Sequence, residues 1–308
     1  MRATFVRGLV DLAGRDERPL LLTGDLGYLV VDPFVERFPR RFFNIGVAEQ
    51  NMVGIACGLA EAGFIPFVYS IATFASLRPY EFVRNGAVYH QLPVRIVGIG
   101  GGFEYGVDGF THHALDDIGA FRLQPAMTVL APADAGQARS ALEATWDQPG
   151  PVYYRLGKDE KTVVDGLEGR FALGRVETIG EGRDLLVLAM GAVSTEADKA
   201  VKALAAEGVR CTLGIVACLS PAPEEDLARL LARFPAALTV EAHNVNGGLG
   251  SLVSEVVAER GLGCRIVRCG VRGLGDGQTG SQAWYEARYG VSAARLVDTA
   301  RDVLRSVR

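Results

Sequence analysis

Residues 127–157 read MTVLAPADAGQARSALEATWDQPGPVYYRLG and carry the pattern that decides the fold. Apolar runs at 127–132 and 151–157 are bounded by proline and glycine, as short buried strands are. Between them, residues 134–146 carry apolar side chains at helical spacing. A strand, a helix and a second strand in this order are typical of a crossover unit in a parallel sheet. The segment therefore predicts an α/β fold.

The same alternation extends in both directions from this unit. Further strands are expected at 19–25, 93–100, 184–192, 209–217, 236–242 and 264–271, and further helices at 46–62, 78–91, 194–207, 223–233 and 249–260. A charged, glycine-containing stretch separates the two series and has room for one edge hairpin near 171–178. We predict two three-layer α/β domains with mostly parallel sheets, at 1–165 and 183–308, joined by a linker at 166–182.

The composition favours small-molecule chemistry. The chain has 308 residues and a formal net charge of −4, from 32 Lys and Arg against 36 Asp and Glu, and neither sign forms a block. This balance argues against nucleic-acid or membrane-surface binding. The five cysteines form no Cys-x-x-Cys pair, which indicates reduced thiols and a cytoplasmic location. Residues 1–16 have the pattern of an amphipathic helix, so we expect no signal peptide.

Two glycine-rich motifs resemble sites that bind a nucleotide or another anion. Gly275, Gly277 and Gly280 spell G-x-G-x-x-G, but no strand and acidic residue follow as a dinucleotide site requires. The stretch 243–251, HNVNGGLGS, lies between an expected strand and an expected helix and could bind an anion with its backbone amides. We favour a tight strand-to-helix turn there, with His243 in a structural role.

The stretch most informative about function is FFNIGVAEQNMVGIACGLAEAGF at 42–64. A turn at 44–46 precedes a helix, and Glu49 falls in the first turn of that helix among small and apolar residues. Two interpretations remain open for this carboxyl group. It complements the helix dipole from the surface, or it is buried in an apolar pocket, where the neutral form can donate a hydrogen bond.

Residues 103–122, FEYGVDGFTHHALDDIGAFR, place two adjacent histidines next to an Asp-Gly turn. Both imidazoles need polar partners, which makes a pair in a glycine-rich loop unusual as core filling. A loop site formed by Asp108, His112 and His113 is one interpretation, and a structural loop is the other. A metal site is the weaker alternative, because adjacent side chains point apart and no third ligand is placed by the sequence.

Taken together, the segments at 42–64 and 103–122 resemble the transketolase family of thiamine diphosphate enzymes. GVAEQNMVGIACGLA resembles the helix of the family's catalytic glutamate, and DGFTHHALDDIGAFR resembles its donor-sugar loop. LTGDL, ATFASLRPYEFVRN, PVYYRLG and TVEAHNVNGGLGS follow the family's order. The resemblance covers nearly the whole chain and implies a pyrimidine-binding domain followed by a transketolase C-terminal domain.

The resemblance also implies roles for particular residues. Glu49 would hydrogen-bond N1′ of the aminopyrimidine of thiamine diphosphate, and Phe74, with Tyr80 nearby, would stack on that ring. His112 would be catalytic and, with Asp108 and His113, would bind the donor sugar.

The resemblance places Arg155 at the position of the family's sugar-phosphate arginine. A guanidinium group suits this role because it can bind a phosphate dianion through two hydrogen bonds. Gly100, however, stands where transketolases carry a phosphate-binding histidine, and Val107 where a glutamate is usual. The resemblance therefore implies transfer of a two-carbon ketol unit from a ketose to an aldehyde more strongly than it implies any one substrate.

The motif that holds the diphosphate and Mg²⁺ in such enzymes is missing. It consists of G-D-G and an Asn some 25–30 residues later, whereas the only G-D-G here, at 275–277, has no Asn after it. The resemblance therefore implies the smaller component of a split transketolase with no metal ligands of its own. A partner chain carrying G-D-G…N would complete it, in an α2β2 heterotetramer.

Two alternatives remain at this point. The GVAEQ helix is shared with deoxyxylulose-phosphate synthase and with β subunits of 2-oxoacid dehydrogenases, where decarboxylation of a 2-oxo acid replaces ketol cleavage. A non-catalytic subunit that stabilises its partner is the other alternative. The DGFTHHALDD loop favours sugar chemistry over the former, and the presence of Glu49, Asp108 and His112 argues against the latter.

Overall fold

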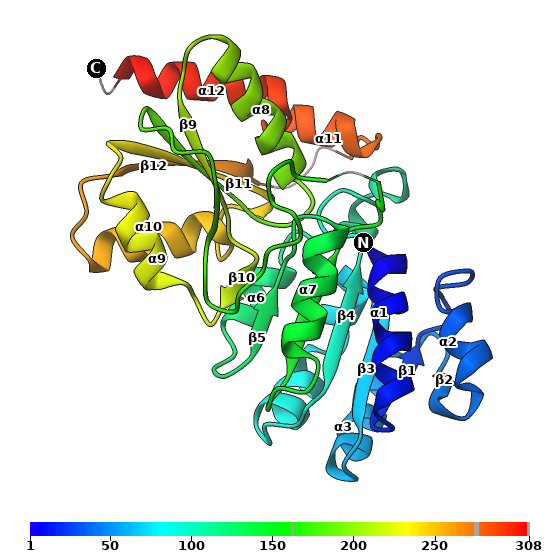
Figure 1. The fold of residues 1–308 in the computed structure, drawn as a ribbon. Helices are drawn as coiled ribbons and strands as arrows, with labels where there is room; N and C mark the ends of the chain where they lie inside the picture. Colours follow the sequence, from blue (N-terminus) through cyan, green and yellow to red (C-terminus); the bar gives the residue numbers. More distant parts are fainter. Residues whose placement is uncertain (162, 274–276, 307–308) are drawn as a thin grey trace.

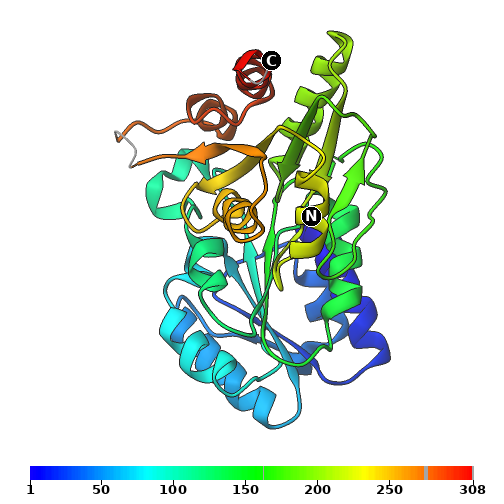
Figure 2. The ribbon, with the colours of Figure 1, turned by 90° about the vertical axis from the view of Figure 1, so that its left-hand side faces the viewer.

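The structure, a computed structural model, describes residues 1–161, 163–273 and 277–306. Over these residues the chain forms two β-sheets flanked by helices, the first mainly from the N-terminal half and the second from the C-terminal half (Figure 1). The second sheet with its helices lies above the first in the original view and in the view turned by 90° (Figure 2). The predicted α/β class with mostly parallel strands is confirmed.

The first sheet has the strand order β10-β5-β6-β4-β3-β1-β2, and every pair is parallel except β10 with β5. Its strands are β1 Pro19–Thr23, β2 Phe42–Asn44, β3 Ile65–Ile71, β4 Arg95–Ile99, β5 Thr128–Leu130, β6 Val152–Leu156 and β10 Cys218–Ser220. Sequence analysis did not anticipate β2, β3 or β10. The last of these comes from the C-terminal half of the chain and pairs with the N-terminal sheet.

Helices cover both faces of the first sheet. They are α1 Arg2–Arg15, α2 Asp32–Arg37, α3 Glu49–Glu61, α4 Ala72–Ser76, α5 Tyr80–Phe82, α6 Asp117–Arg122 and α7 Ala135–Thr145. Side chains of β1 alternate between the faces, as a strand requires. Leu21 packs in the cluster formed with α1 and α7, whereas Leu20 and Leu22 pack in the cluster formed with α3.

The second sheet has the order β12-β11-β8-β9-β7. Its strands are β7 Glu177–Ile179, β8 Leu185–Ala189, β9 Cys211–Ile215, β11 Ala236–Asn244 and β12 Arg265–Val271, and its helices are α8 Ser194–Ala206, α9 Glu224–Leu231, α10 Leu249–Glu259, α11 Gln282–Arg288 and α12 Ala293–Ser306. The hairpin expected near 171–178 is instead the single strand β7, which pairs antiparallel with β9.

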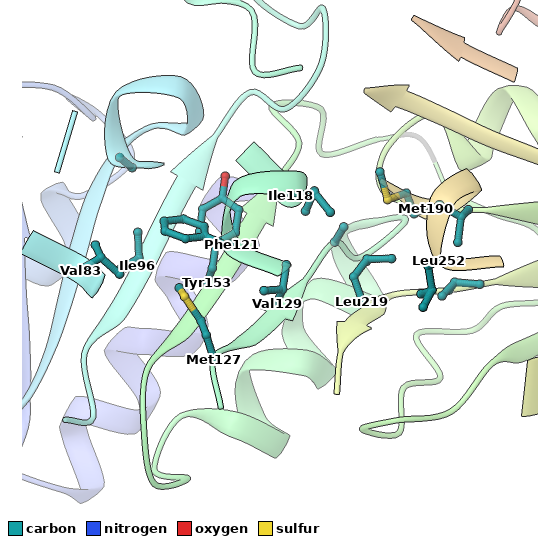
Figure 3. Close-up of a cluster of buried hydrophobic side chains, with 14 of the residues drawn as sticks. Val83, Ile96, Ile118, Phe121, Met127, Val129, Tyr153, Met190, Leu219 and Leu252 are labelled. Atoms are coloured by element: carbon teal, nitrogen blue, oxygen red, sulfur yellow. The ribbon is translucent and has the colours of Figure 1, made fainter. Parts of the chain in front are cut away.

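One apolar cluster runs without interruption from the first half of the chain into the second (Figure 3). Ile118 and Phe121 of α6 and Val129 of β5 lie on the side of the first sheet, and Leu219 of β10 and Leu252 of α10 continue the cluster into the second half. All five side chains are at most 3% exposed. The two halves therefore share a core, which fixes their relative position next to the segments that carry the candidate site.

Candidate functional site

The carboxyl group of Glu49 is buried and hydrogen-bonded by two side chains. Helix α3 begins at Glu49, as the sequence predicts, and the residue is only 2% exposed, so the surface interpretation is wrong. Ser70 Oγ, at the end of β3, donates to Oε1 at 3.0 Å. Arg78 Nη1 donates to Oε2 at 2.9 Å. The pocket is thus less apolar than expected, because a cation and a hydroxyl both face the carboxylate.

Arg78 also joins Glu49 to Phe74. Its guanidinium lies over the Phe74 ring at 3.9 Å from the ring centroid, a cation–π arrangement. The edge of the His112 imidazole approaches the same phenyl ring, with 5.1 Å between the centroids. The structure therefore brings Glu49, Phe74 and His112 together. Sequence analysis missed Ser70 and Arg78 as parts of this group, although Arg78 lies four residues after Phe74 in the quoted run.

The predicted histidine loop folds as two short 3₁₀ turns, Gly106–Asp108 and Phe110–His112. Asp108 ends the first turn and is exposed, whereas His112 ends the second and contacts Thr111 Oγ1 through Nδ1 at 3.0 Å. The two imidazoles face different surroundings, which agrees with the argument against a metal site.

His113 is directed into an aromatic cluster behind the loop. Its ring packs edge-on against Phe103 and Tyr285, and Nε2 lies 3.3 Å from the carbonyl oxygen of Gly106. Burial lowers the pKa of His113, so the imidazole is neutral at pH 7 and can donate to that carbonyl. The position of His113 is that of a residue supporting the loop from behind.

A cavity of about 750 Å³ adjoins this group of residues. Its walls include Phe74 and Arg78 from the first half and Asn244 and Thr279 from the second, together with the loop residue Phe110. It lies beyond the carboxyl ends of the parallel strands of the first sheet, where open α/β sheets bind their ligands. Of the predicted site residues, Phe74 and His113 line this space, which is large enough for a small molecule. Glu49 and His112 do not line it but contact its wall residues Arg78 and Phe74, and Asp108 is not part of the lining.

Gly100 cannot be replaced by a larger residue in this structure. Its φ is +78°, and a Cβ atom there would lie 2.1 Å from the ring of Tyr105. The ring of Tyr105 lies 6.2 Å from that of His112, and Lys158 Nζ lies 3.9 Å from the Tyr105 centroid. The ring of Tyr105 thus fills the space that a histidine side chain at position 100 would need.

Arg155 does not join the site, in contrast to the role implied by the resemblance. It is 4% exposed, and its Nε donates to Asp117 Oδ2 at 2.9 Å. Its Nη2 donates to the carbonyl oxygens of Ala114 and Ala242 at 2.7 and 2.9 Å. Because Ala242 belongs to β11, this arginine links the two halves of the chain and has little surface left for a substrate.

Tyr80 also lies apart from the cavity lining. Its hydroxyl donates to the carbonyl oxygen of Ala120 at 3.0 Å and receives a hydrogen bond from Gln124. Its ring stacks on Phe121 with 6.0 Å between centroids. The residue expected next to the pyrimidine is therefore packed on α6. The helix predicted at 78–91 begins as α5 and continues without interruption as a π-helical segment at Val83–Val88.

The glycine-rich turn after β11 already contains a carboxyl group of this chain. Glu241 is fully buried, and its two oxygens accept hydrogen bonds from the backbone N–H groups of Leu249 and Gly250, each at 2.8 Å, at the start of α10. The structural interpretation of this turn is therefore confirmed. His243 is also fully buried, and its Nε2 accepts from the N–H of Gly119 at 3.2 Å. Of the G-x-G-x-x-G motif, Gly275 falls outside the described residues, as does Asp276 of G-D-G.

The described residues hold no group of three His, Cys, Asp or Glu side chains that could bind a metal ion. No helix in the described part of the chain is long and apolar enough to cross a membrane. The five cysteines are all free, and burial raises the pKa of Cys57, Cys218, Cys264 and Cys269 to about 11. Thiols with such pKa values are poor nucleophiles at pH 7.

Comparison with known proteins agrees with these features. The family "Transketolase, pyrimidine binding domain" matches residues 1–162, and "Transketolase, C-terminal domain" matches residues 174–296. A "6-deoxy-6-sulfo-D-fructose transketolase subunit SqwH" from Clostridium sp. is 34% identical over 98% of this chain and 94% of its own length. A 1-deoxy-D-xylulose-5-phosphate synthase from Desulforudis audaxviator is 32% identical over 96% of this chain, which spans 47% of that enzyme.

Among solved structures, a "Split gene transketolase, inactive beta4 tetramer" superimposes with a TM-score of 0.88 at 34% identity, covering all of this chain and 98% of the other. The two family matches follow one another along the chain in the order of the two sheets. The chain belongs to the transketolase family and is similar to the subunits of split transketolases that carry the pyrimidine-binding and C-terminal domains.

Proposed function

We propose that this chain is the pyrimidine-binding component of a split enzyme that transfers a two-carbon ketol unit from a ketose to an aldehyde. The observation that carries the proposal is the buried carboxylate of Glu49 at the start of α3, with the ring of Phe74 joined to it through Arg78. A carboxyl group next to an aromatic ring suits a flat heterocycle that needs a stacking surface and a partner for a ring nitrogen.

The residues present fit the aminopyrimidine of thiamine diphosphate. A planar, nitrogen-bearing guanidinium already lies against Phe74 and donates to Glu49, so a group of that shape can be accommodated there. When bound, thiamine diphosphate supplies the carbon nucleophile that attacks the ketose carbonyl. Glu49 would hold the proton at N1′ of the pyrimidine, and Phe74 would orient the ring by stacking.

The histidine loop is proposed to bind the sugar. Asp108 is exposed, and His112 lies against Phe74, so both can reach a substrate placed next to the pyrimidine. Their hydrogen bonds to the donor hydroxyls would orient the carbonyl group, and the imidazole of His112 can move a proton on a substrate oxygen. We propose a supporting role for His113, because its ring is buried in the aromatic cluster, and structural roles for Tyr80 and Arg155.

We propose that activity requires a second chain that carries G-D-G…N and holds the diphosphate and Mg²⁺. Large apolar side chains are exposed around the site, with Val107 at 74%, Phe110 at 64% and Leu77 at 39%. Such a group of exposed apolar residues is typical of a surface that another protein covers. An α2β2 heterotetramer in the cytoplasm remains the arrangement we propose.

The test is reconstitution with the cognate diphosphate-binding chain. The two chains are mixed with thiamine diphosphate and Mg²⁺, and ketol transfer from a set of phosphorylated, sulfonated and neutral ketoses to aldehydes is followed. We expect transfer only when both chains are present. If the partner alone has the same turnover with and without this chain, the chain is a non-catalytic subunit and the proposal is wrong.

A second candidate function comes from the similarity to 1-deoxy-D-xylulose-5-phosphate synthase over 96% of the chain. The same mixture is therefore supplied with pyruvate and an aldehyde in place of the ketose. CO₂ release from pyruvate without any ketose donor would favour this second function. Absence of CO₂ together with ketol transfer would favour the first.

A further inference from the structure

A single side chain occupies both of the contacts that the aminopyrimidine would need. The guanidinium of Arg78 covers a face of the Phe74 ring at 3.9 Å from the centroid. The same group donates to Glu49 Oε2 at 2.9 Å. The other oxygen, Glu49 Oε1, accepts a hydrogen bond from Ser70 Oγ. A heterocycle cannot stack on this face and reach this oxygen while the guanidinium is there.

The chemistry of the guanidinium matches that of the ring that would replace it. Both are flat, both carry nitrogen atoms joined through one carbon, and both can place an N–H in the plane toward a carboxylate. Both also gain from stacking on a phenyl ring. Arg78 therefore satisfies Glu49, which is 2% exposed and would otherwise lack a cationic partner.

Arg78 is also free to leave. Its side chain is 43% exposed, whereas that of Glu49 is 2% exposed, so only the arginine end of the pair reaches solvent. It lies in the short connection between α4 and α5 and borders the cavity of about 750 Å³. Asp116 lines the same cavity and adds a carboxyl group to its wall.

We propose that Arg78 is an internal placeholder for the aminopyrimidine. In the cofactor-free chain it makes the contacts with Glu49 and Phe74 that the aminopyrimidine would make, and it is displaced when the cofactor binds. The proposal rests on the proposed function, since it takes Glu49 and Phe74 to be the pyrimidine contacts. It makes Arg78 a competitor of the cofactor in this conformation. The free energy needed to break the arginine contacts is then subtracted from the free energy of cofactor binding, so the observed affinity is weaker than the intrinsic affinity.

The experiment measures binding rather than turnover. The dissociation constant of thiamine diphosphate, with Mg²⁺ and the cognate diphosphate-binding chain, is determined by calorimetry for the wild type, Arg78→Ala and Arg78→Lys. Arg84→Ala is the matched control, because Arg84 is exposed, lies six residues after Arg78, and donates through Nη1 to the neighbouring Asn85. The midpoint of thermal unfolding of each cofactor-free chain is measured in parallel.

Removing the placeholder should strengthen cofactor binding and lower the stability of the cofactor-free chain. We expect the dissociation constant of Arg78→Ala to fall on the order of 3- to 10-fold, because a cation–π contact and a half-exposed ion pair no longer have to be broken. Its unfolding midpoint should fall below that of the wild type. Arg78→Lys keeps the charge without the flat group and should lie between, and Arg84→Ala should match the wild type.

Unchanged or weaker cofactor binding by both Arg78 variants, with normal binding by the wild type, would overturn the placeholder role alone. Arg78→Lys keeps this test available if Arg78→Ala does not fold. A wild-type complex that binds no thiamine diphosphate would instead overturn the proposed function, and the placeholder role with it. The two failures are thus distinguished by the wild-type measurement.

Discussion

Two buried glutamates lie at helix N-termini in this molecule, one in each sheet's domain. Glu49 starts α3 and is hydrogen-bonded by side chains, one of which belongs to Arg78 and is 43% exposed. Glu241 reaches the start of α10 from β11 and is hydrogen-bonded by the backbone N–H groups of Leu249 and Gly250. Both carboxyl groups are at most 2% exposed.

The difference lies in whether the partners can be exchanged. Backbone donors at a helix N-terminus cannot leave without unwinding the first turn, so the Glu241 carboxylate is fixed in place. The guanidinium that faces Glu49 reaches solvent and can be exchanged for a ligand that offers the buried carboxylate an equivalent partner. A buried carboxylate with an exchangeable partner can accept a ligand, whereas one with backbone partners stabilises the fold.

The largest expected effect separates the two glutamates by activity. Glu49→Gln should reduce turnover of the reconstituted enzyme by about 10²- to 10⁴-fold, because the amide cannot hold the proton at N1′. Glu241→Gln should stay within about threefold of the wild type at a temperature where it is folded, since no ligand contact is lost. Initial rates with a saturating ketose donor measure both, and subunit assembly is checked by gel filtration. Near-normal turnover of Glu49→Gln would contradict the comparison.

The second effect concerns the free energy of unfolding, which should fall more in Glu241→Gln than in Glu49→Gln. Glu241→Gln should lower the free energy of unfolding by about 1–3 kcal/mol, because the amide nitrogen would face a buried backbone N–H that it cannot satisfy. Glu49→Gln should change it by less than about 1 kcal/mol, because the lost ion pair is open to solvent on the arginine side. Urea unfolding of the isolated chain gives both values, and equal losses would remove the distinction.

The third effect is a dependence of stability on pH. Burial raises the pKa of Glu241 and of Glu104 to about 7 in the folded chain. Both groups therefore bind a proton more tightly in the folded state, so their contribution is complete at low pH and is lost as the pH rises through 7. Each should reduce the free energy of unfolding by about 1 kcal/mol between pH 6 and pH 8.

Unfolding curves across this pH range measure the dependence, and Glu241→Gln should remove the share that belongs to Glu241. Glu104→Gln is the matched variant for the other half, since its carboxylate accepts from the backbone N–H of Lys158. A pH profile identical to that of the wild type in both variants would show that these carboxyls are not the source.

The last effect extends the comparison to Tyr80, whose hydroxyl donates to the carbonyl oxygen of Ala120. Because this partner is a backbone group, Tyr80 resembles Glu241, whose partners cannot be exchanged, rather than Glu49. Tyr80→Phe should lower the free energy of unfolding by about 1–3 kcal/mol, because the hydrogen bonds to Ala120 and from Gln124 are both lost. The dissociation constant of thiamine diphosphate should not change. A weaker cofactor affinity in this variant would return Tyr80 to the site.

What the sequence predicted depends on how local the governing interactions are. The strand at 151–157 and the first-turn position of Glu49 follow from residues only a few positions away, so periodicity and turn signals were sufficient. The partners of Arg155 lie 38, 41 and 87 residues from it in the chain. No spacing rule anticipates such contacts, so the sequence could not show that this arginine is buried between the two halves.

The same reasoning explains the omission of Arg78. Its partner Glu49 is 29 residues away. The start of α3 lies against the end of β3, where Ser70 bonds the same carboxyl group, so the contact depends on the packing of these elements. An arginine in a run of mixed composition is usually a solvated surface residue, and its 43% exposure shows why such a reading is natural. Only the three-dimensional arrangement shows that its guanidinium faces a buried carboxylate.

The short strand β10 has a consequence for cutting the chain. It leaves the C-terminal half to pair with β5, with Cys218 opposite Leu130. A fragment that ends before β10 would present β5 as an unprotected edge, and open edges recruit strands from other chains and cause aggregation. Expression of residues 1–165 alone should therefore give insoluble material. Because the second half supplies the edge strand of the first half's sheet, the first half is not expected to serve as an independent module when it is grafted onto another protein.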